Sequence, residues 1–515
     1  MRRPLFRCRF KNRFKKTWRN LSPKQAAILL VLLLPLFGCG THTSTSPASI
    51  TTTPPPPQAL QPLVNQPASI VNLSFLLTDG SVIFQDQNFS DWSKLTPDQF
   101  GSYLKGTWSQ LASLPAGYAP EFFASALLAD GRLVIVGGEY NFGAFVLTNQ
   151  AAIYDPVADT WTSLDPPGGW DYIGDSPSVV LPNGQFLLGR KLDTLMAALD
   201  PATLQWTAVG SAGKSDFNAE EGWTLLPDGS VLTIDVKNAP NSERYIPSTG
   251  TWVSAGSTIV DLHSPGGGCL VYAGGCYDPP GEIGPAVLRP DGTVFATGSK
   301  STAGPGHTAI YTPPAISTDP GTWTAGPDFP NNDNSGDSYA VLLPNGHVLV
   351  EGNSGTLYDF DGQKLTPGDL VTSSSSLLVL PTGEVIVAGS AVQIYTPSGQ
   401  SSPSWAPTIT AFPASVTRGS TYSISGTQFN GLSQAAGYGD ENETATNYPL
   451  VRITNQASGH VFYARTHGHS AMAVATGSAI VSTNFDVPLG METGVSTLEV
   501  VANGIPSLSV TVTVN

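Results

Sequence analysis

Carboxylate side chains recur at one position of a hairpin that occurs seven times in the chain. Each hairpin is an apolar strand, a tight turn that ends in glycine and a second apolar strand, as in "AVLLPNGHVLVEG" at residues 340–352. In five of the seven hairpins an acid stands eight to ten residues before the turn glycine. These acids are Glu121, Asp175, Glu220 with Glu221, Glu282 and Asp337, and the other two hairpins offer Asn72 and Ser374.

Such acids could bind a cation or a polar ligand if the fold brings them together. Converging carboxylates repel one another, which raises their pKa values unless a cation compensates. Hard oxygen ligands suit Ca²⁺, and His467 together with Asp337 would extend the choice to Mn²⁺. The same oxygens could instead accept hydrogen bonds from sugar hydroxyls, with Tyr140 as a stacking surface. The alternative is a set of solvated loop acids with no shared role.

The repeated hairpins predict a β-propeller. Behind most of them follow a third strand, a turn and a fourth strand that usually carries tryptophan, as in "AIYDPVADTWTSL". Four strands per repeat, at a spacing of roughly 37 to 63 residues, are typical of kelch-type blades. We therefore predict an all-β protein with a seven-bladed propeller over residues 68–405. The five acids would then lie where innermost strands begin, at the rim of the central channel.

The last part of the chain, residues 406–515, has a different rhythm. Segments such as "STLEVVANGIPSLSVTVTV" alternate apolar and polar residues with the period of half-buried strands. This pattern predicts a small β-sandwich of immunoglobulin-like shape.

The first residues predict export. Residues 1–38 combine a basic stretch with a short apolar run, which is the pattern of a signal peptide. The run ends in "LFGC", which resembles a bacterial lipobox, so we expect Cys39 to be lipidated and the protein to sit in the cell envelope as an outer-membrane lipoprotein. Plain secretion is the alternative. Residues 39–67 are rich in Ser, Thr and Pro and predict an extended tether. Export makes a disulfide between Cys269 and Cys276 the expected state of that pair.

The charge of the exported part limits its partners. After Cys39 it carries 14 basic residues and 39 acidic residues, a net charge of −25. A body this acidic repels phosphate backbones, so we expect no nucleic-acid partner. The expected partners are a glycan or a protein, with the membrane reached through the lipid, and the expected state is a monomer.

These features together resemble galactose oxidase and glyoxal oxidase, which are copper-radical oxidases with a kelch propeller and a C-terminal early-set domain. The similarity covers nearly everything after the tether, and "PEFFASALLADGRLVIVGGEYNFGAF" is among its most specific parts. The resemblance implies a copper ion held by imidazole and phenolate groups, and a tyrosine cross-linked to a cysteine that carries the radical.

The residues depart from that family at the copper site. Phe122 stands where the family has its cross-linked tyrosine, and Gly336-Asp337 stands where a Tyr-His pair of ligands would be. The histidine of the family's channel loop has a counterpart, His467, and Tyr140 falls near the family's stacking aromatic residue. We therefore expect copper to be absent.

Three functions follow. The first is a surface-tethered binding or scaffolding protein whose channel face holds a glycan, a peptide or a protein. The second is an enzyme, such as a hydrolase or lyase, that uses the rim carboxylates with His467 as a base or a metal ligand. The third is a copper-radical oxidase of sugars or aldehydes that recruits Cys269 or Cys276 as the radical partner.

Overall fold

The computed structural model describes residues 59–265, 270–272, 275–277, 281–299, 304–316, 318–371, 374–438 and 444–515, with backbone alone for 270, 275–277 and 374–375. All of them belong to one compact unit, Pro54–Asn515. The predicted signal peptide, the lipidation site Cys39 and the disulfide partner Cys269 lie outside the described residues. In the described part of the chain, no helix has the length and apolar character needed to cross a membrane.

Each predicted hairpin forms as a turn between two buried strands. In the hairpin of β27 (Ala340–Leu342) and β28 (Val348–Glu351), Leu342 lies opposite Val348. The backbone N–H of Gly346 donates to the carbonyl of Leu343 at 2.9 Å, and Gly346 has a φ of +87°. A glycine adopts this left-handed conformation without steric cost, which explains why the turn ends in one.

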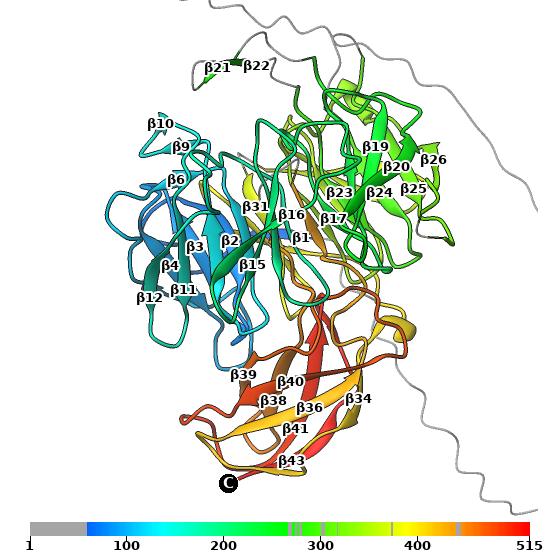
Figure 1. Cartoon of the computed structure of the whole chain (residues 1–515). Helices are drawn as coiled ribbons and strands as arrows, with labels where there is room; N and C mark the ends of the chain where they lie inside the picture. Colours follow the sequence, from blue (N-terminus) through cyan, green and yellow to red (C-terminus); the bar gives the residue numbers. More distant parts are fainter. Residues whose placement is uncertain are drawn as a thin grey trace, which may run out of the picture. The chain divides into compact units, whose positions relative to one another are not determined.

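The hairpins extend into antiparallel sheets of four strands in meander order, with labels as in Figure 1. The first four sheets follow in chain order. One sheet is β2 (Val71–Leu76), β3 (Val82–Asp86), β4 (Trp92–Thr96) and β5 (Thr107–Gln110). The next is β7 (Ala124–Leu127), β8 (Leu133–Val136), β11 (Ala151–Asp155) and β12 (Thr160–Leu164). The third is β13 (Ser178–Val180), β14 (Phe186–Gly189), β15 (Met196–Asp200) and β16 (Gln205–Val209). The fourth is β17 (Thr224–Leu225), β18 (Val231–Ile234), β19 (Asn241–Ile246) and β20 (Thr251–Ser257).

Three further sheets continue the pattern. One is β23 (Ala286–Leu288), β24 (Val294–Thr297), β25 (Thr308–Thr312) and β26 (Thr322–Ala325). The next is β27, β28, β29 (Thr356–Phe360) and β30 (Leu365–Leu370), joined at β27 by β37 (Ala436–Gly437). The last is β31 (Ser374–Val379), β32 (Val385–Gly389), β33 (Gln393–Thr396) and β1 (Ala59–Pro62). Short 3-10 helices lie at Pro330–Asn332 and Pro403–Trp405.

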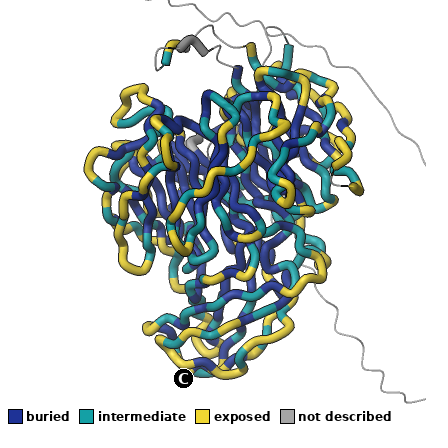
Figure 2. The backbone as a smooth tube through the Cα atoms, viewed as in Figure 1, coloured by how far each residue is buried: buried dark blue, intermediate teal, exposed yellow. Residues whose placement is uncertain are grey.

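The first strands of neighbouring sheets pack side by side. Strand β31 contacts both β27 and β2, and β23 contacts both β17 and β27. The hydroxyl groups of Ser74 in β2 and Ser376 in β31 lie 2.7 Å apart, which connects the first sheet to the last. The first two strands of these sheets are mostly buried (Figure 2). Sheets of four strands whose first strands line one axis are the architecture of a β-propeller.

Tryptophans on outer strands pack between the sheets. Trp92 of β4 and Trp161 of β12 have ring centroids 5.0 Å apart, and Trp323 of β26 donates its indole N–H to the carbonyl of Ala255 in β20 at 3.1 Å. These contacts join consecutive sheets.

The end of the predicted tether belongs to the last sheet. Strand β1 lies within the predicted tether, residues 39–67, and pairs with β33 from Ala59–Thr396 to Pro62–Gln393. The N–H of Leu63 donates to the carbonyl of Val392 at 3.0 Å, and the Leu63 side chain is buried. The composition of the tether hid this strand because its hydrogen-bond partner lies more than 300 residues away in the sequence.

The C-terminal segment forms its own sheet system. Its strands are β34 (Thr408–Ala411), β35 (Ser415–Val416), β36 (Thr421–Thr427), β38 (Leu450–Asn455), β39 (Val461–His467), β40 (Ile480–Asp486), β41 (Gly494–Ala502), β42 (Ile505–Pro506) and β43 (Val510–Val514). Strand β39 pairs with β38 in its first half and with β40 in its second half. A strand that changes partners in this way forms a corner between two sheets, and a separate apolar cluster that includes Phe485 and Leu498 fills the space between them.

Removing β1 should loosen the closure between the first and last sheets. A chain that begins at residue 68 lacks β1 and Leu63, and we expect it to be about 2–5 kcal/mol less stable than a chain that begins at residue 54. Urea denaturation of the two chains measures the difference. Equal denaturation midpoints would show that β1 contributes nothing to closure.

Candidate functional site

The starts of several inner strands meet at one cavity. Asn72 in β2, Glu121 before β7 and Asp337 before β27 all line a cavity of about 450 Å³. Because residues from three sheets share this cavity, the first strands of those sheets begin at the same end of the propeller. The predicted convergence of acids therefore holds for Glu121 and Asp337. Asp337 also lines a neighbouring cavity of about 460 Å³.

Glu121 and Tyr140 are opposite each other in a short sheet. This sheet consists of β6 (Pro120–Glu121), β9 (Tyr140–Asn141) and β10 (Ala144–Phe145), with Glu121 opposite Tyr140. The ring of Tyr140 makes edge-to-face contacts with Phe122 and Phe145, at centroid distances of 6.1 and 5.8 Å. Phe122 and Phe145 are both exposed. The acid therefore lies beside a patch of aromatic rings.

A buried lysine binds two of the other predicted acids. The ammonium group of Lys191 donates to Asp175 and, at 2.6 Å, to Glu220. The side chains of Lys191 and Asp175 are only 4% and 6% exposed. Burial alone would lower the pKa of Lys191, but the two carboxylates outweigh that effect and raise it. Burial raises the pKa of Asp175, and Lys191 opposes the rise. This lysine supplies a positive charge that we had assigned to a metal ion.

Glu282 and Asp337 form a carboxyl pair. Burial, followed by the charges of Glu220 and Asp337, raises the pKa of Glu282 to about 9, so this group is protonated at neutral pH. The Glu282 carboxyl interacts with that of Asp337, and the Tyr438 hydroxyl also interacts with Asp337. Asp337 contacts solvent through the cavity, but the surrounding protein still raises its pKa.

Glu139 extends the acidic group. It is half-buried, and burial raises its pKa, with Lys191 opposing the rise and Glu220, Asp337 and Glu121 adding to it. The electrostatic interactions of Glu139 thus reach three of the five predicted acids and the lysine. We call the set Glu121, Glu139, Asp175, Glu220, Glu282 and Asp337 the acidic rim.

The backbone is strained at equivalent places around the rim. Phe122, Glu220 and Asp337 have φ values of +51°, +55° and +50°, and each lies two to four residues before an inner strand. Residues other than glycine rarely adopt this conformation, which costs on the order of 1 kcal/mol or more per residue. Strain of this kind clusters at functional sites.

His467 lies at the opposite end of the inner strands. The N–H of Thr466 donates to the carbonyl of Thr78, in the turn that follows β2, whereas the cavity lies at the start of β2. Six residues of extended chain separate Asn72 from Thr78, or about 20 Å. The His467 ring donates to Asp486 at 3.1 Å. Burial opposes ionisation of Asp486, but hydrogen bonds from Thr421, His467 and Arg465 outweigh it and lower its pKa.

A different C-terminal segment reaches the cavity. Strand β37 pairs with β27, and the side-chain carbonyl of Gln434 accepts a hydrogen bond from the N–H of Leu225 at 2.8 Å. This segment brings the ring of Tyr438 to 4.6 Å from that of Tyr339, and both tyrosines line the cavity. The expected pairing of His467 with Asp337 is therefore wrong. The C-terminal residue that lines the cavity with Asp337 is Tyr438.

The residues that we missed follow second strands. Lys191 comes after β14 and Glu139 after β8, and antiparallel pairing returns the end of each second strand to the level at which its first strand began. Acids and bases just after the second strand were therefore a usable signal, and "GGEY" and "GRKL" contain it.

The cavity does not suit a copper-radical site. Its described lining is Asn72, Leu73, Gln85, Phe89, Glu121, Phe122, Phe123, Asp337, Tyr339 and Tyr438, which includes neither an imidazole nor a thiol. Asn72 and Phe122 stand where a radical site would need cysteine and tyrosine. Two phenols and two carboxylates form an oxygen-only donor set, which favours hard cations over copper.

Comparison with known proteins finds likeness in structure alone. No protein-family profile matches the chain, and no curated protein matches it in sequence. A fungal alcohol oxidase in complex with copper is 14% identical, with a TM-score of 0.48 over 90% of this chain and 99% of that one. A streptogramin B lyase is 13% identical, with a TM-score of 0.44 over 66% and 97%. The extracellular domain of a putative hybrid two-component system from B. thetaiotaomicron is 12% identical, with a TM-score of 0.43 over 90% and 60%. At these scores no function follows from the likeness.

Removing the rim lysine should destabilise the chain strongly. Lys191→Met leaves Asp175 buried without its counter-charge, and we expect a loss of about 3–5 kcal/mol in unfolding free energy at pH 7. Urea denaturation measures it. Adding Asp175→Asn to this variant should recover part of the lost stability, because it removes the buried carboxylate that no longer has a counter-charge. A loss below about 1 kcal/mol would contradict the buried pairing.

Glu282 should make stability depend on pH. Its pKa rises from the ordinary 4.5 to about 9 on folding, so the folded chain binds more protons than the unfolded chain between these values. Stability should therefore fall as pH rises from about 5 to 9, by at most about 1.4 kcal/mol per pH unit from this group. Glu282→Gln keeps a donor toward Asp337 and should flatten the curve. Parallel curves for the two proteins would exclude a protonated Glu282.

Proposed function

We propose that the chain is an exported binding protein that holds a glycan at the acidic rim. In this proposal the four-stranded sheets are the seven blades of a kelch-type propeller, and the C-terminal strands are an immunoglobulin-like early-set sandwich. The change of partners along β39 and the separate apolar cluster around Phe485 support the sandwich. The signal-like residues 1–38 and the lipobox-like Cys39 support export and anchoring in the envelope, and we propose that the protein acts as a monomer.

The cavity between Glu121 and Asp337 carries the proposal. A volume of about 450 Å³ lies in the usual range for small-molecule sites. Its walls combine the two acids with the rings of Phe122, Tyr339 and Tyr438. Carboxylate oxygens can accept hydrogen bonds from sugar hydroxyls, while aromatic faces can pack against the apolar side of a sugar ring.

The charge state of the rim favours a neutral ligand over a cationic peptide. Lys191 already pairs with Asp175 and Glu220, and the raised pKa of Glu282 keeps this carboxyl protonated next to Asp337. A rim with both protonated and ionised carboxyls offers donors and acceptors together, as hydroxyl groups require. A cationic peptide, or a calcium or manganese ion at the rim, would instead require Glu282 to lose its proton.

The carboxyl pair supports an enzyme as the second candidate. A protonated Glu282 next to Asp337 could serve as a general acid in a hydrolase or lyase. We propose that copper-radical chemistry is absent, since the described lining of the cavity lacks imidazole and thiol groups. Product formation from a bound glycan at pH 7 would establish the enzyme over the binding protein.

Binding should be lost when the cavity is changed and retained when the opposite end is changed. The chain from residue 54 is screened on a glycan array, and the best ligand is titrated by calorimetry. We expect Asp337→Asn to weaken binding at least tenfold, about 1.4 kcal/mol, and Tyr438→Phe to have a smaller effect.

His467→Ala is the matched control, because its neighbour Thr466 bonds to Thr78, which lies about 20 Å along the chain from Asn72 in the cavity. It should bind with the affinity of the unmodified chain. No glycan binding, or a loss that is equal in Asp337→Asn and His467→Ala, would contradict the proposed site. Binding of basic peptides alone would identify a protein ligand in its place.

A further inference from the structure

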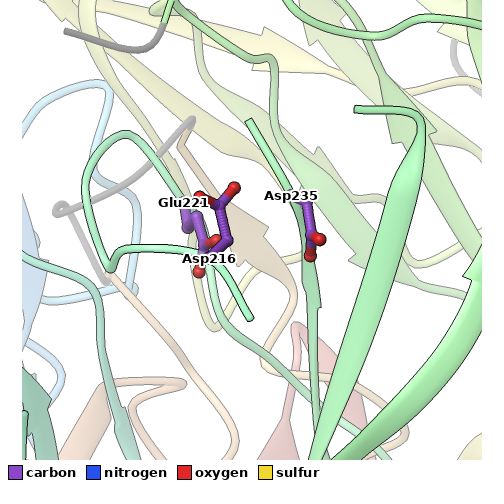
Figure 3. Close-up of side chains that lie close together, drawn as sticks. All are labelled: Asp216, Glu221 and Asp235. Carbon is purple, nitrogen blue, oxygen red and sulfur yellow. The ribbon is translucent and has the colours of Figure 1, made fainter. Parts of the chain in front are cut away.

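A second group of acids lies next to the sheet of β17–β20. Asp216 comes from the loop before β17, Glu221 stands just before β17 and Asp235 follows β18 (Figure 3). One oxygen from each carboxylate lies within 4.8 Å of the others, and all three residues are buried. We call Asp216, Glu221 and Asp235 the buried triad. None of its members contributes to the cavity described above.

Asp235 has no hydrogen-bond partner for either oxygen within the described part of the chain. It is 0% exposed, so water does not take that place at the surface. Burial raises the pKa of Asp235, and the hydroxyl of Ser215, which is near but not in hydrogen-bonding geometry, only partly opposes the rise. A buried carboxylate that lacks partners is costly, and in native structures such a group usually signals a ligand or a special role.

The other two acids are held in place by protein donors. Asp216 accepts hydrogen bonds from the backbone N–H groups of Phe217 and Lys237, both at 2.8 Å. Glu221 accepts from the ammonium of Lys214 at 2.8 and 3.1 Å and from the hydroxyl of Thr233 at 3.1 Å. These contacts fix two ligands beside the unpartnered Asp235, and each carboxylate still has lone pairs to offer.

Among the described residues, one ammonium group, that of Lys214, donates hydrogen bonds to this group of acids. Lys214 donates to Glu221 and Glu243, and its Nζ lies 4.7 Å from the centre of the Trp252 ring. Its hydrogen bonds to side chains within the described residues go to Glu221 and Glu243. With Glu243, four buried carboxyl groups face one ammonium group, so a further positive charge would be stabilised here.

We propose that the buried triad binds one divalent cation, and that this cation is Ca²⁺. Two oxygens on opposite sides of a Ca²⁺ ion are about 4.6–5.2 Å apart, which fits a set of ligand atoms that lie within 4.8 Å of one another. Mg²⁺ is less suited, since it keeps several waters and is seldom held by protein ligands alone. Lys214 would remain on the outer side of Glu221.

The ion would join the loop before β17 to the end of β18. Glu220, the residue next to Glu221, faces Lys191 at the rim, so the cation would also fix the direction of a rim acid. This role is structural and does not depend on which ligand the rim holds.

The purified full chain, stripped with a chelator, tests the proposal with Ca²⁺ alone and with Tb³⁺. We expect one equivalent of Ca²⁺ to bind and to raise the melting temperature by several degrees. Tb³⁺ should show luminescence excited through Trp252, and Ca²⁺ should compete it away. No Ca²⁺-dependent rise in melting temperature in the unmodified chain would overturn the proposal.

Asp235→Asn removes one ligand without changing the shape of the side chain. We expect Ca²⁺ affinity to fall at least tenfold and the melting shift to disappear, while the metal-free variant stays at least as stable as the metal-free parent. Asp175→Asn, a buried acid of the rim, is the matched control and should keep the full Ca²⁺ shift. Equal shifts in the parent and Asp235→Asn would overturn the assignment, as would loss of the shift in Asp175→Asn alone.

Discussion

Carboxyl groups withdrawn from water at the ends of the inner strands need counter-charges, and the chain supplies few. Lys191 serves the rim and Lys214 serves the interior of the β17–β20 sheet. Two consecutive residues belong to different sites: Glu220 accepts a hydrogen bond from Lys191, and Glu221 accepts one from Lys214. The positive φ of Glu220 accompanies this change of direction. The strained backbone at Glu220 therefore allows two neighbouring glutamates to reach two different lysines.

The excess of acid determines what the rim can bind. Partial burial disfavours ionised carboxyl groups, and protonation of Glu282 lowers the negative charge of the rim. The result is a surface that both donates and accepts hydrogen bonds, flanked by the exposed rings of Phe122 and Phe145. This is why we propose a neutral, hydroxyl-rich ligand rather than a phosphate or a strongly charged group.

The features that depend on residues close together in the sequence could be predicted: the hairpins and the acids before the inner strands. The hairpins were visible because turn glycines and apolar runs recur, and Glu121 and Asp337 were located because each precedes an inner strand by a fixed count. Strand β1 was not visible, because its composition is that of a tether and its partner is distant. Lys191 and Glu139 were missed because only first strands were searched. Tyr438 and His467 could not be told apart, since no local signal shows which C-terminal loop reaches the channel.

The direction of a single side chain was the hardest feature to predict. Nothing in "NAEEGW" indicates that one glutamate faces the rim and the next faces a buried lysine. Asp235 follows a strand like many other polar residues, and only its complete burial without a hydrogen-bond partner distinguishes it. Sites that depend on burial and on missing partners become visible only in three dimensions.

Infrared spectroscopy of the folded chain tests the central claim most directly, because a protonated carboxylic acid has a carbonyl stretching band that a carboxylate lacks. The account predicts that this band is present at pH 7.5, has lost about half of the Glu282 contribution near pH 9, and is weaker by one carboxyl group in Glu282→Gln at pH 7.5. A spectrum with no protonated carboxyl band above pH 6 would mean that the rim acids titrate as separate, solvated groups, and the account would be wrong.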